Sequence, residues 1–280
     1  MIGTILALRR AFVVALGLAV VAGPTQFQAQ AQGYPNKVIS ILVPAAAGGP
    51  TDTVARLIAE SMTKTLGQTV IVENAGGAGG TIGMAKVARA APDGYSLAVW
   101  HIAQATAPSL YDGLKYDVIN DFDSIGRITD VPMTIVAKSA LPPKDIASFM
   151  EWLKANAAKA TYGHAGIGSA SHLCGLMFLD KVGVKVEGVG YRGTGPAMAD
   201  LLAGQFDFMC DQTTGTTGPI RDGKIQGYAV TTKFKVASVP NLPTLDSTAM
   251  PGFEVSAWHA MWAPKGLPKD VQDKLKYLER

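Results

Sequence analysis

The stretch V-I-S-I-L-V-P-A-A-A-G-G-P-T-D-T-V-A-R spans residues 38–56 and passes from an apolar run through a loop of small residues into a helix-like segment. An apolar run such as residues 38–43 is typical of a strand that is buried on both faces of a parallel sheet. The apolar residues that follow recur at helical spacing up to Leu66, and Gly67 stands where a helix C-cap belongs. The stretch therefore predicts a strand, a tight loop and a helix in that order.

The same alternation of strands and helices continues along the chain. Further strands are predicted at residues 70–72, 96–100, 161–165, 184–191, 206–211 and 226–232, with a β-rich run over 125–137 that is broken at 130–132. Short strands that alternate with helices indicate an α/β fold with two mostly parallel sheets flanked by helices. We expect a two-lobed binding-protein architecture with a hinge and a central cleft. Residues 34–130 and 229–280 would form the first lobe and residues 131–228 the second.

The first 31 residues have the features of a secretory signal peptide. Arg9 and Arg10 precede an apolar stretch of 13 residues, 11–23, and Ala29-Gln30-Ala31 offers an A-x-A cleavage site. A membrane span needs about 20 apolar residues, which disfavours the alternative of a short N-terminal anchor. We expect cleavage near Ala31 and export to the periplasm.

The charge balance excludes a polyanionic partner. The chain has 25 basic and 22 acidic residues, and removing the first 31 residues, which include two arginines and no acidic residue, leaves 23 against 22. A nearly neutral protein is not built to bind nucleic acid. The two cysteines, Cys174 and Cys210, stand in an apolar helix and an apolar strand, so a disulfide and two buried thiols are both consistent with the sequence.

Three loops share one pattern: a strand, a run of small residues and the start of a helix. They are residues 45–52, 166–172 and 191–196. In open α/β sheets, ligands bind at the carboxyl ends of the strands, where the first turn of a helix presents unpaired N–H groups and about half a positive charge. Such loops can hold a carboxylate or a phosphate through backbone amides. Alternatively, the glycines only form turns, and Thr51 or Asp52 only caps its helix.

The residues expected to bind a ligand come mainly from these loops. They are Ala47, Gly48, Gly49, Thr51, Asp52, Ser169, Ala170, Ser171, His172, Tyr191 and Thr194, together with His101, Gln104 and Asp211 at the ends of two other strands. For three of them the sequence leaves another role open. His101 can be an exposed surface residue, Tyr191 a half-buried packing residue, and Asp211 a cap of the following turn.

Nucleotide-binding and catalytic patterns are incomplete in this sequence. No glycine run is followed by the lysine of a Walker A motif, and the G-x-G segments at 77–79 and 166–168 lack the third glycine of a dinucleotide fingerprint. Ser171 and His172 are adjacent at a helix start, so they do not face each other as nucleophile and base. We therefore expect no catalytic residues, no metal and no cofactor. A secreted serine hydrolase that uses Ser171 and His172 is the alternative from another class.

Several longer motifs carry a resemblance to a known family. They are V-P-A-A-A-G-G-P-T-D-T-V-A-R (43–56), G-G-A-G-G-T-I-G (76–83), P-D-G-Y-S-L (92–97), Y-G-H-A-G-I-G-S-A-S-H-L (162–173), Y-R-G-T-G-P-A-M-A-D-L-L-A-G-Q-F-D (191–207), A-V-T-T-K (229–233) and L-P-T-L (242–245). In this order they resemble the periplasmic solute-binding proteins of the tripartite tricarboxylate transporter system, the Bug receptor family. The resemblance implies a two-lobed protein that closes over a small organic acid, such as a dicarboxylate, a tricarboxylate or an aromatic acid. It also implies that the loops at 45–52 and 168–172 grip the ligand from opposite lobes, partly through backbone amides and ordered water.

The resemblance further implies a partner, a membrane transporter with one large and one small subunit. We expect the receptor itself to be a monomer, and a ligand sensor for a membrane kinase is a further alternative. Relatives usually continue beyond the point where this chain ends, so we expect the part of the first lobe after residue 229 to be truncated. The loop residues 45–47 are all alanine where relatives often differ, so the identity of the acid does not carry over.

Overall fold

The computed structural model describes residues 33–277, and from Pro35 onward these residues form one compact unit. The expected signal peptide and its cleavage site near Ala31 lie outside the described residues. Within the part of the chain that is described, no helix is long and apolar enough to cross a membrane.

The first sheet is built around β1 (Ile39–Val43). This strand lies between β2 (Val70–Asn74) and β3 (Ser96–His101) and is parallel to both, while β9 (Ser256–Pro264) pairs antiparallel with β3. Four of the five β1 residues are buried, which explains the apolar run. Helix α2 (Pro50–Leu66) has a proline in its first turn and ends at Gly67, which adopts a φ of 67°. The predicted strand, loop and helix are confirmed.

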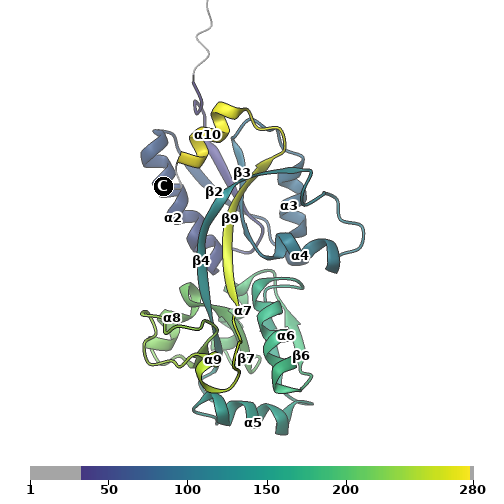
Figure 1. Cartoon of the computed structure of the whole chain (residues 1–280), viewed down its shortest axis with the longest axis vertical. Coiled ribbons are helices and arrows are strands. Elements are labelled where there is room, and N and C mark those ends of the chain that lie inside the picture. Colours follow the sequence, from purple (N-terminus) through teal and green to yellow (C-terminus); the bar gives the residue numbers. More distant parts are fainter. Residues whose placement is uncertain (1–32, 278–280) are drawn as a thin grey trace, which may run out of the picture. The chain divides into compact units, whose positions relative to one another are not determined.

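A strand of 17 residues, β4 (Phe122–Lys138), is shared by two sheets. It pairs antiparallel with β9 up to Pro132, and beyond Pro132 it pairs antiparallel with β7 (Phe208–Gln212) and β8 (Ile225–Val230). The predicted break at 130–132 is therefore wrong. Pro132 has no N–H to donate, but it stands where the strand changes partners, so few backbone hydrogen bonds between strands are lost there. Figure 1 shows β4 and β9 running side by side between the two groups of elements.

The second sheet is built around β5 (Thr161–His164). This strand lies between β6 (Glu187–Gly190) and β7 and is parallel to both. Helices α5 (Ile146–Asn156), α6 (Ala170–Val182), α7 (Thr194–Leu202) and α8 (Thr213–Arg221) alternate with these strands. The α/β class is confirmed. The sheets are more mixed than expected, because every pair made by β4 is antiparallel.

The core of the second sheet is aromatic and carries the disulfide. The ring of Phe149 lies 4.4 Å from that of Tyr228, 5.3 Å from Phe208 and 6.0 Å from Phe178, measured between centroids. Beside these rings Cys174 and Cys210 form a disulfide that links α6 to β7, with their Cα atoms 5.9 Å apart. Of the two alternatives that the sequence left open, the structure therefore contains the disulfide.

Two helices were not predicted. Helix α4 (Ala103–Leu110) follows β3 and contains Pro108, and α8 follows β7 and contains Pro219. The remaining helices are α3 (Thr81–Ala88) and α10 (Lys269–Tyr277), together with the short η1 (Ala78–Gly80) and α9 (Leu245–Thr248). The division into two lobes at residues 130 and 229 stays a prediction, although β4 changes partners close to the first of these positions.

Candidate functional site

Four helices each begin after a strand, and the N-cap or first-turn residues of each helix line one pocket. They are α2 behind β1, α6 behind β5, α7 behind β6 and α8 behind β7, with Gly49, Ser169, Gly193 and Gln212 as their N-caps. The first amides of a helix have no carbonyl partner within that helix, and they carry a partial positive charge. The convergence therefore creates a region of positive potential from backbone atoms alone.

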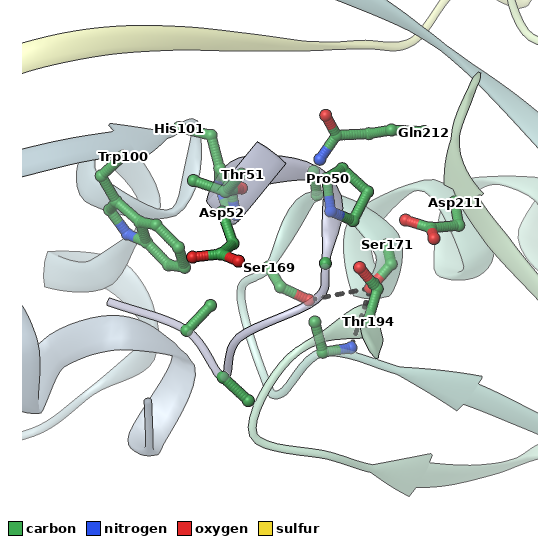
Figure 2. A pocket seen from close by; sticks show the side chains of 15 residues that line it. Pro50, Thr51, Asp52, Trp100, His101, Ser169, Ser171, Thr194, Asp211 and Gln212 are labelled. Atoms are coloured by element: carbon green, nitrogen blue, oxygen red, sulfur yellow. Dashed lines mark hydrogen bonds between the residues drawn. The ribbon is translucent and has the colours of Figure 1, made fainter. Parts of the chain in front are cut away.

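The pocket is narrow. Fifteen residues line it: Ala45, Ala46, Gly49, Pro50, Thr51, Asp52, Trp100, His101, Ala165, Ser169, Ala170, Ser171, Thr194, Asp211 and Gln212 (Figure 2). The centre of a water molecule can occupy only about 20 Å³ of the pocket, which is close to the minimum that holds one water. The walls therefore lie close together.

Nine of the fourteen residues expected to bind ligand line this pocket: Gly49, Thr51, Asp52, His101, Ser169, Ala170, Ser171, Thr194 and Asp211. The other five, Ala47, Gly48, Gln104, His172 and Tyr191, are not among the lining residues. The Tyr191 hydroxyl donates to Asp200 at 2.7 Å and its ring packs beside Phe206, which matches the packing role. Gln104 is buried, with neither amide atom hydrogen-bonded among the described residues.

The sequence interpretation missed six lining residues: Ala45, Ala46, Pro50, Trp100, Ala165 and Gln212. Each of them lies within or next to a predicted loop, or next to a predicted residue. Trp100 precedes His101 at the end of β3, and Gln212 follows Asp211 at the end of β7. Extending each predicted site by one residue along its strand would have included both.

The α2 loop is held by an acidic side chain. The helix N-cap is Gly49, so Thr51 and Asp52 lie in the first turn and the prediction that one of them is the cap is wrong. The Asp52 carboxylate instead accepts from the Gly48 amide and from Arg56, both at 3.0 Å. Burial alone would raise the pKa of Asp52. These two hydrogen bonds, together with one donated by the Asn74 side chain at the end of β2, lower that pKa instead. The Gly48 amide, expected to face a ligand, is therefore already used.

The α6 loop is organised by two serines. Ser169 is the N-cap and accepts from the His172 amide at 3.2 Å. Ser171 accepts from the Ala165 amide at 2.8 Å, and the two serine hydroxyls are 3.2 Å apart. His172 Nδ1 accepts from the Gly168 amide at 3.2 Å. Ser171 and His172 thus have separate partners, and the arrangement does not form the nucleophile and base of a hydrolase.

Two buried histidines lie beside the start of α2, and one of them, His101, lines the pocket. His101 is buried rather than exposed, and its Nδ1 accepts from the Ala103 amide at 3.2 Å while its ring stacks on Trp100. The His101 and His259 rings are nearly perpendicular with their centroids 5.9 Å apart, and His259 Nε2 lies 3.1 Å from the Thr51 hydroxyl. Burial lowers the pKa of His259 to about 4 and that of His101 well below its usual value. Both imidazoles are therefore neutral near pH 7 and add no charge to the pocket.

Asp211 is the one lining carboxyl group without a partner. It ends β7, is 1% exposed, and neither oxygen has a hydrogen bond of good geometry among the described residues. Burial raises the pKa of Asp211 to about 7, and the nearby Gln212 amide and Thr194 hydroxyl offset only part of this rise. The N-cap of α8 is Gln212, not Asp211. The cap role left open by the sequence is thus not the one observed.

Residues from the two sheets touch around the pocket. The Tyr111 hydroxyl, just after α4, donates to the Ile167 carbonyl before α6 at 2.8 Å. The Ala46 amide donates to the Arg192 carbonyl, also at 2.8 Å. At Gly195 in α7, a Cβ would lie only 2.7 Å from the Ala47 carbonyl oxygen, so a side chain there would separate α7 from the α2 loop.

The pocket offers neutral donors in place of cationic side chains. The lining residues include no lysine and no arginine, and the acidic ones are Asp52 and Asp211. The described residues contain no cluster of histidine, cysteine or acidic side chains that could hold a metal ion. An anionic group would therefore be held by first-turn amides and by hydroxyl groups.

Comparisons with known proteins identify the family. Residues 54–279 match the family described as the tripartite tricarboxylate transporter family receptor. A UPF0065 protein encoded in the TAR-I ttuE-ttuC' intergenic region of Agrobacterium vitis is 53% identical over 248 residues, which cover 88% of this chain and 72% of that protein. The solved structure of the periplasmic binding protein BugD is 54% identical, has a TM-score of 0.86, and covers 88% of this chain and 82% of its own.

A second solved structure, MatC from Rhodopseudomonas palustris with bound malate, is 38% identical, with a TM-score of 0.84 and coverage of 88% of this chain and 84% of that one. Family members of this kind are periplasmic binding proteins rather than enzymes. The matched motifs, the fold and the comparisons together show that this chain belongs to the tripartite tricarboxylate transporter receptor family, the Bug-type periplasmic solute-binding proteins.

Proposed function

We propose that the protein captures a small carboxylate, such as a dicarboxylate, a tricarboxylate or an aromatic acid, in the pocket of helix first turns. The observation that carries the proposal is the convergence of four helix N-termini on a pocket whose lining has no lysine or arginine. First-turn amides bind carboxylates without a cationic side chain. The malate bound to MatC, a relative of this chain, supports the same class of ligand.

Binding of such an acid needs a change in the pocket. Hydrogen bonds between residues of the two sheets hold the walls of the pocket together, so the walls must part to admit an acid before they close around it. We expect residues 34–130 with 229–280 to move as one lobe and residues 131–228 as the other, hinged on the strands that join them. The ligand then stabilises the closed arrangement because it contacts both walls.

Membership of the receptor family supports a proposal for where this cycle takes place. The mature chain would start after cleavage near Ala31, act as a monomer in the periplasm, and deliver the acid to a membrane transporter with one large and one small subunit. Uptake of the identified acid by cells with and without the gene tests the delivery step.

A thermal-shift screen of the mature chain tests the binding step. Dicarboxylates, tricarboxylates, aromatic acids and acidic amino acids are compared with neutral amides such as succinamide as matched controls. An acid at about 100 times its Kd should stabilise the protein by about 2.7 kcal/mol, which corresponds to roughly 5–10 °C for a chain of this size. If the protein unfolds cooperatively and no acid raises the melting temperature above the amide controls, the proposal is wrong.

A further inference from the structure

The pocket has two chemically different sides. On one side, the first turns of α2 and α6 present hydrogen-bond donors from Thr51, Ala170 and their neighbours. On the other side, the end of β7 presents acceptors: both carboxyl oxygens of Asp211 and the Oε1 atom of Gln212 are buried and unpartnered among the described residues. Figure 2 shows Asp211 and Gln212 away from Trp100 and His101 across the pocket.

The Gln212 amide and the Thr194 hydroxyl lie near Asp211, but neither carboxyl oxygen has a hydrogen bond of good geometry among the described residues, so these acceptors are open to donors from outside the chain. Asp211 is 1% exposed and Gln212 is 4% exposed, so bulk water does not solvate them. A buried polar group without a partner carries a large desolvation penalty, and a carboxylate carries more than a neutral group. Even when protonated, Asp211 keeps an oxygen that accepts. The carboxylate of a ligand has only acceptors, so it can accept from the O–H of a protonated Asp211 but cannot satisfy the acceptor oxygens that remain on Asp211 and Gln212.

The two sides are close enough for one small molecule to reach both. A Cβ placed on Gly215 would lie 3.0 Å from Asp211 Oδ2 and 3.1 Å from Pro50 Cγ, so these two atoms are no more than about 6 Å apart. Pro50 is in the first turn of α2, beside the donor groups. A ligand whose carboxylate meets the α2 and α6 amides therefore places its neighbouring substituent near the end of β7.

We propose that Asp211 and Gln212 form a subsite for a hydrogen-bond donor on the ligand, so that the protein selects acids that carry a hydroxyl or an ammonium group near a carboxylate. This inference rests on the proposed function, because it specifies the class of acid that the pocket holds. Either a hydroxyl group or an ammonium group on the ligand can supply this hydrogen-bond donor. Asp211 is thereby a residue that determines specificity.

The test uses acids that share a carbon skeleton and differ in one substituent. Titration calorimetry with the mature chain compares succinate, malate and aspartate, and then glutarate, 2-hydroxyglutarate and glutamate. A hydrogen bond to a charged acceptor is worth a factor of roughly 10 to 100 in affinity, so a substituted acid should bind at least about tenfold more tightly than its unsubstituted parent. If malate or 2-hydroxyglutarate binds most tightly, the donor on the ligand is a hydroxyl group. If aspartate or glutamate binds most tightly, the donor is an ammonium group.

Variants of Asp211 link the preference to this side chain. Asp211→Leu keeps the branching of the side chain but is larger and has no acceptor, and it should reduce the preference to less than about threefold while the parent diacid still binds. Asp211→Asn keeps one acceptor, so it should retain a hydroxyl preference and lose an ammonium preference. Asp180→Asn, on the exposed side of α6, is the matched control and should leave every ratio unchanged. Circular dichroism and melting curves confirm that each variant is folded.

Two results would overturn the inference. If the wild-type protein binds succinate and glutarate as tightly as their substituted forms, the donor subsite is wrong and the carboxylate receptor stands. If wild-type ratios survive in Asp211→Leu, the preference arises elsewhere in the pocket and Asp211 does not determine it. Binding of no acid at all would remove both the subsite and the proposed function.

Discussion

The Cys174–Cys210 disulfide should contribute about 4 kcal/mol to the free energy of unfolding. Its two cysteines are 36 residues apart in the sequence. In the chain-entropy description, closing a loop of that length removes about 13 cal/mol/K from the unfolded chain, or about 3.8 kcal/mol at 25 °C. The bond also joins α6 to β7 inside the aromatic core. When the disulfide is reduced, the folded state therefore loses a covalent link between two elements that frame the pocket.

Urea unfolding of the mature chain, oxidised and reduced, measures this contribution. The reduced sample is prepared by reduction in denaturant and refolding with reductant present, so that both samples keep their sulfur atoms. With a slope of about 3 kcal/mol per molar urea, the midpoint should fall by more than about 1 M on reduction. The double variant Cys174→Ala/Cys210→Ala is the control, because reductant should not move its midpoint. A fall of less than about 0.3 M would refute the reasoning, since it would mean that the unfolded chain is already restricted without the bond.

Three further substitutions test the walls of the pocket. Gly195→Ala should weaken acid binding about tenfold, because its Cβ would meet the α2 loop backbone at 2.7 Å, whereas Gly218→Ala on α8, with nothing within 4 Å, should leave the calorimetric affinity unchanged. Tyr111→Phe removes one hydrogen bond between the two sheets and should weaken binding by about 2- to 12-fold, and an unchanged Kd would show that this bond does not depend on closure. The Asp211 pKa is raised from 3.8 to about 7, so between these values the folded chain holds a proton that the unfolded chain has released, and stability falls as the pH rises. Asp211→Asn should therefore stabilise the unliganded protein more at pH 8 than at pH 4, by a difference on the order of 4 kcal/mol in urea unfolding, and equal differences at both pH values would contradict this.

The elements that could be predicted are those in which local pattern and burial agree. The β1 run is apolar because the strand is buried between two neighbours, and α2 shows its period, its first-turn proline and its terminal glycine. Helices α4 and α8 escaped prediction because each contains a proline and is built from small or polar residues, so neither presents an apolar stripe. The unbroken β4 could not be read from the sequence, since Pro132 is tolerated there through a change of strand partners.

The site could be predicted as a set of strand ends but not as a set of contacts. The loops of α2, α6 and α7 meet at one pocket, as their shared pattern indicated. Their individual roles depend on hydrogen bonds that cross between loops or turn back within them. The Asp52 carboxylate accepts a hydrogen bond from the Gly48 amide, and the Tyr191 hydroxyl donates to Asp200. Both choices are set by tertiary geometry that spacing along the chain does not contain.

Because the pocket lining contains no lysine and no arginine, the salt concentration around the protein should have little effect on ligand binding. Ionic strength screens exposed charges over about 8–10 Å of solution, but it screens buried groups much less. An acid held by first-turn amides inside closed walls should keep its affinity when the external salt concentration changes. The bound acid should therefore dissociate at the same rate in dilute and in salty surroundings, whereas a site built from surface cations would lose affinity as salt increases.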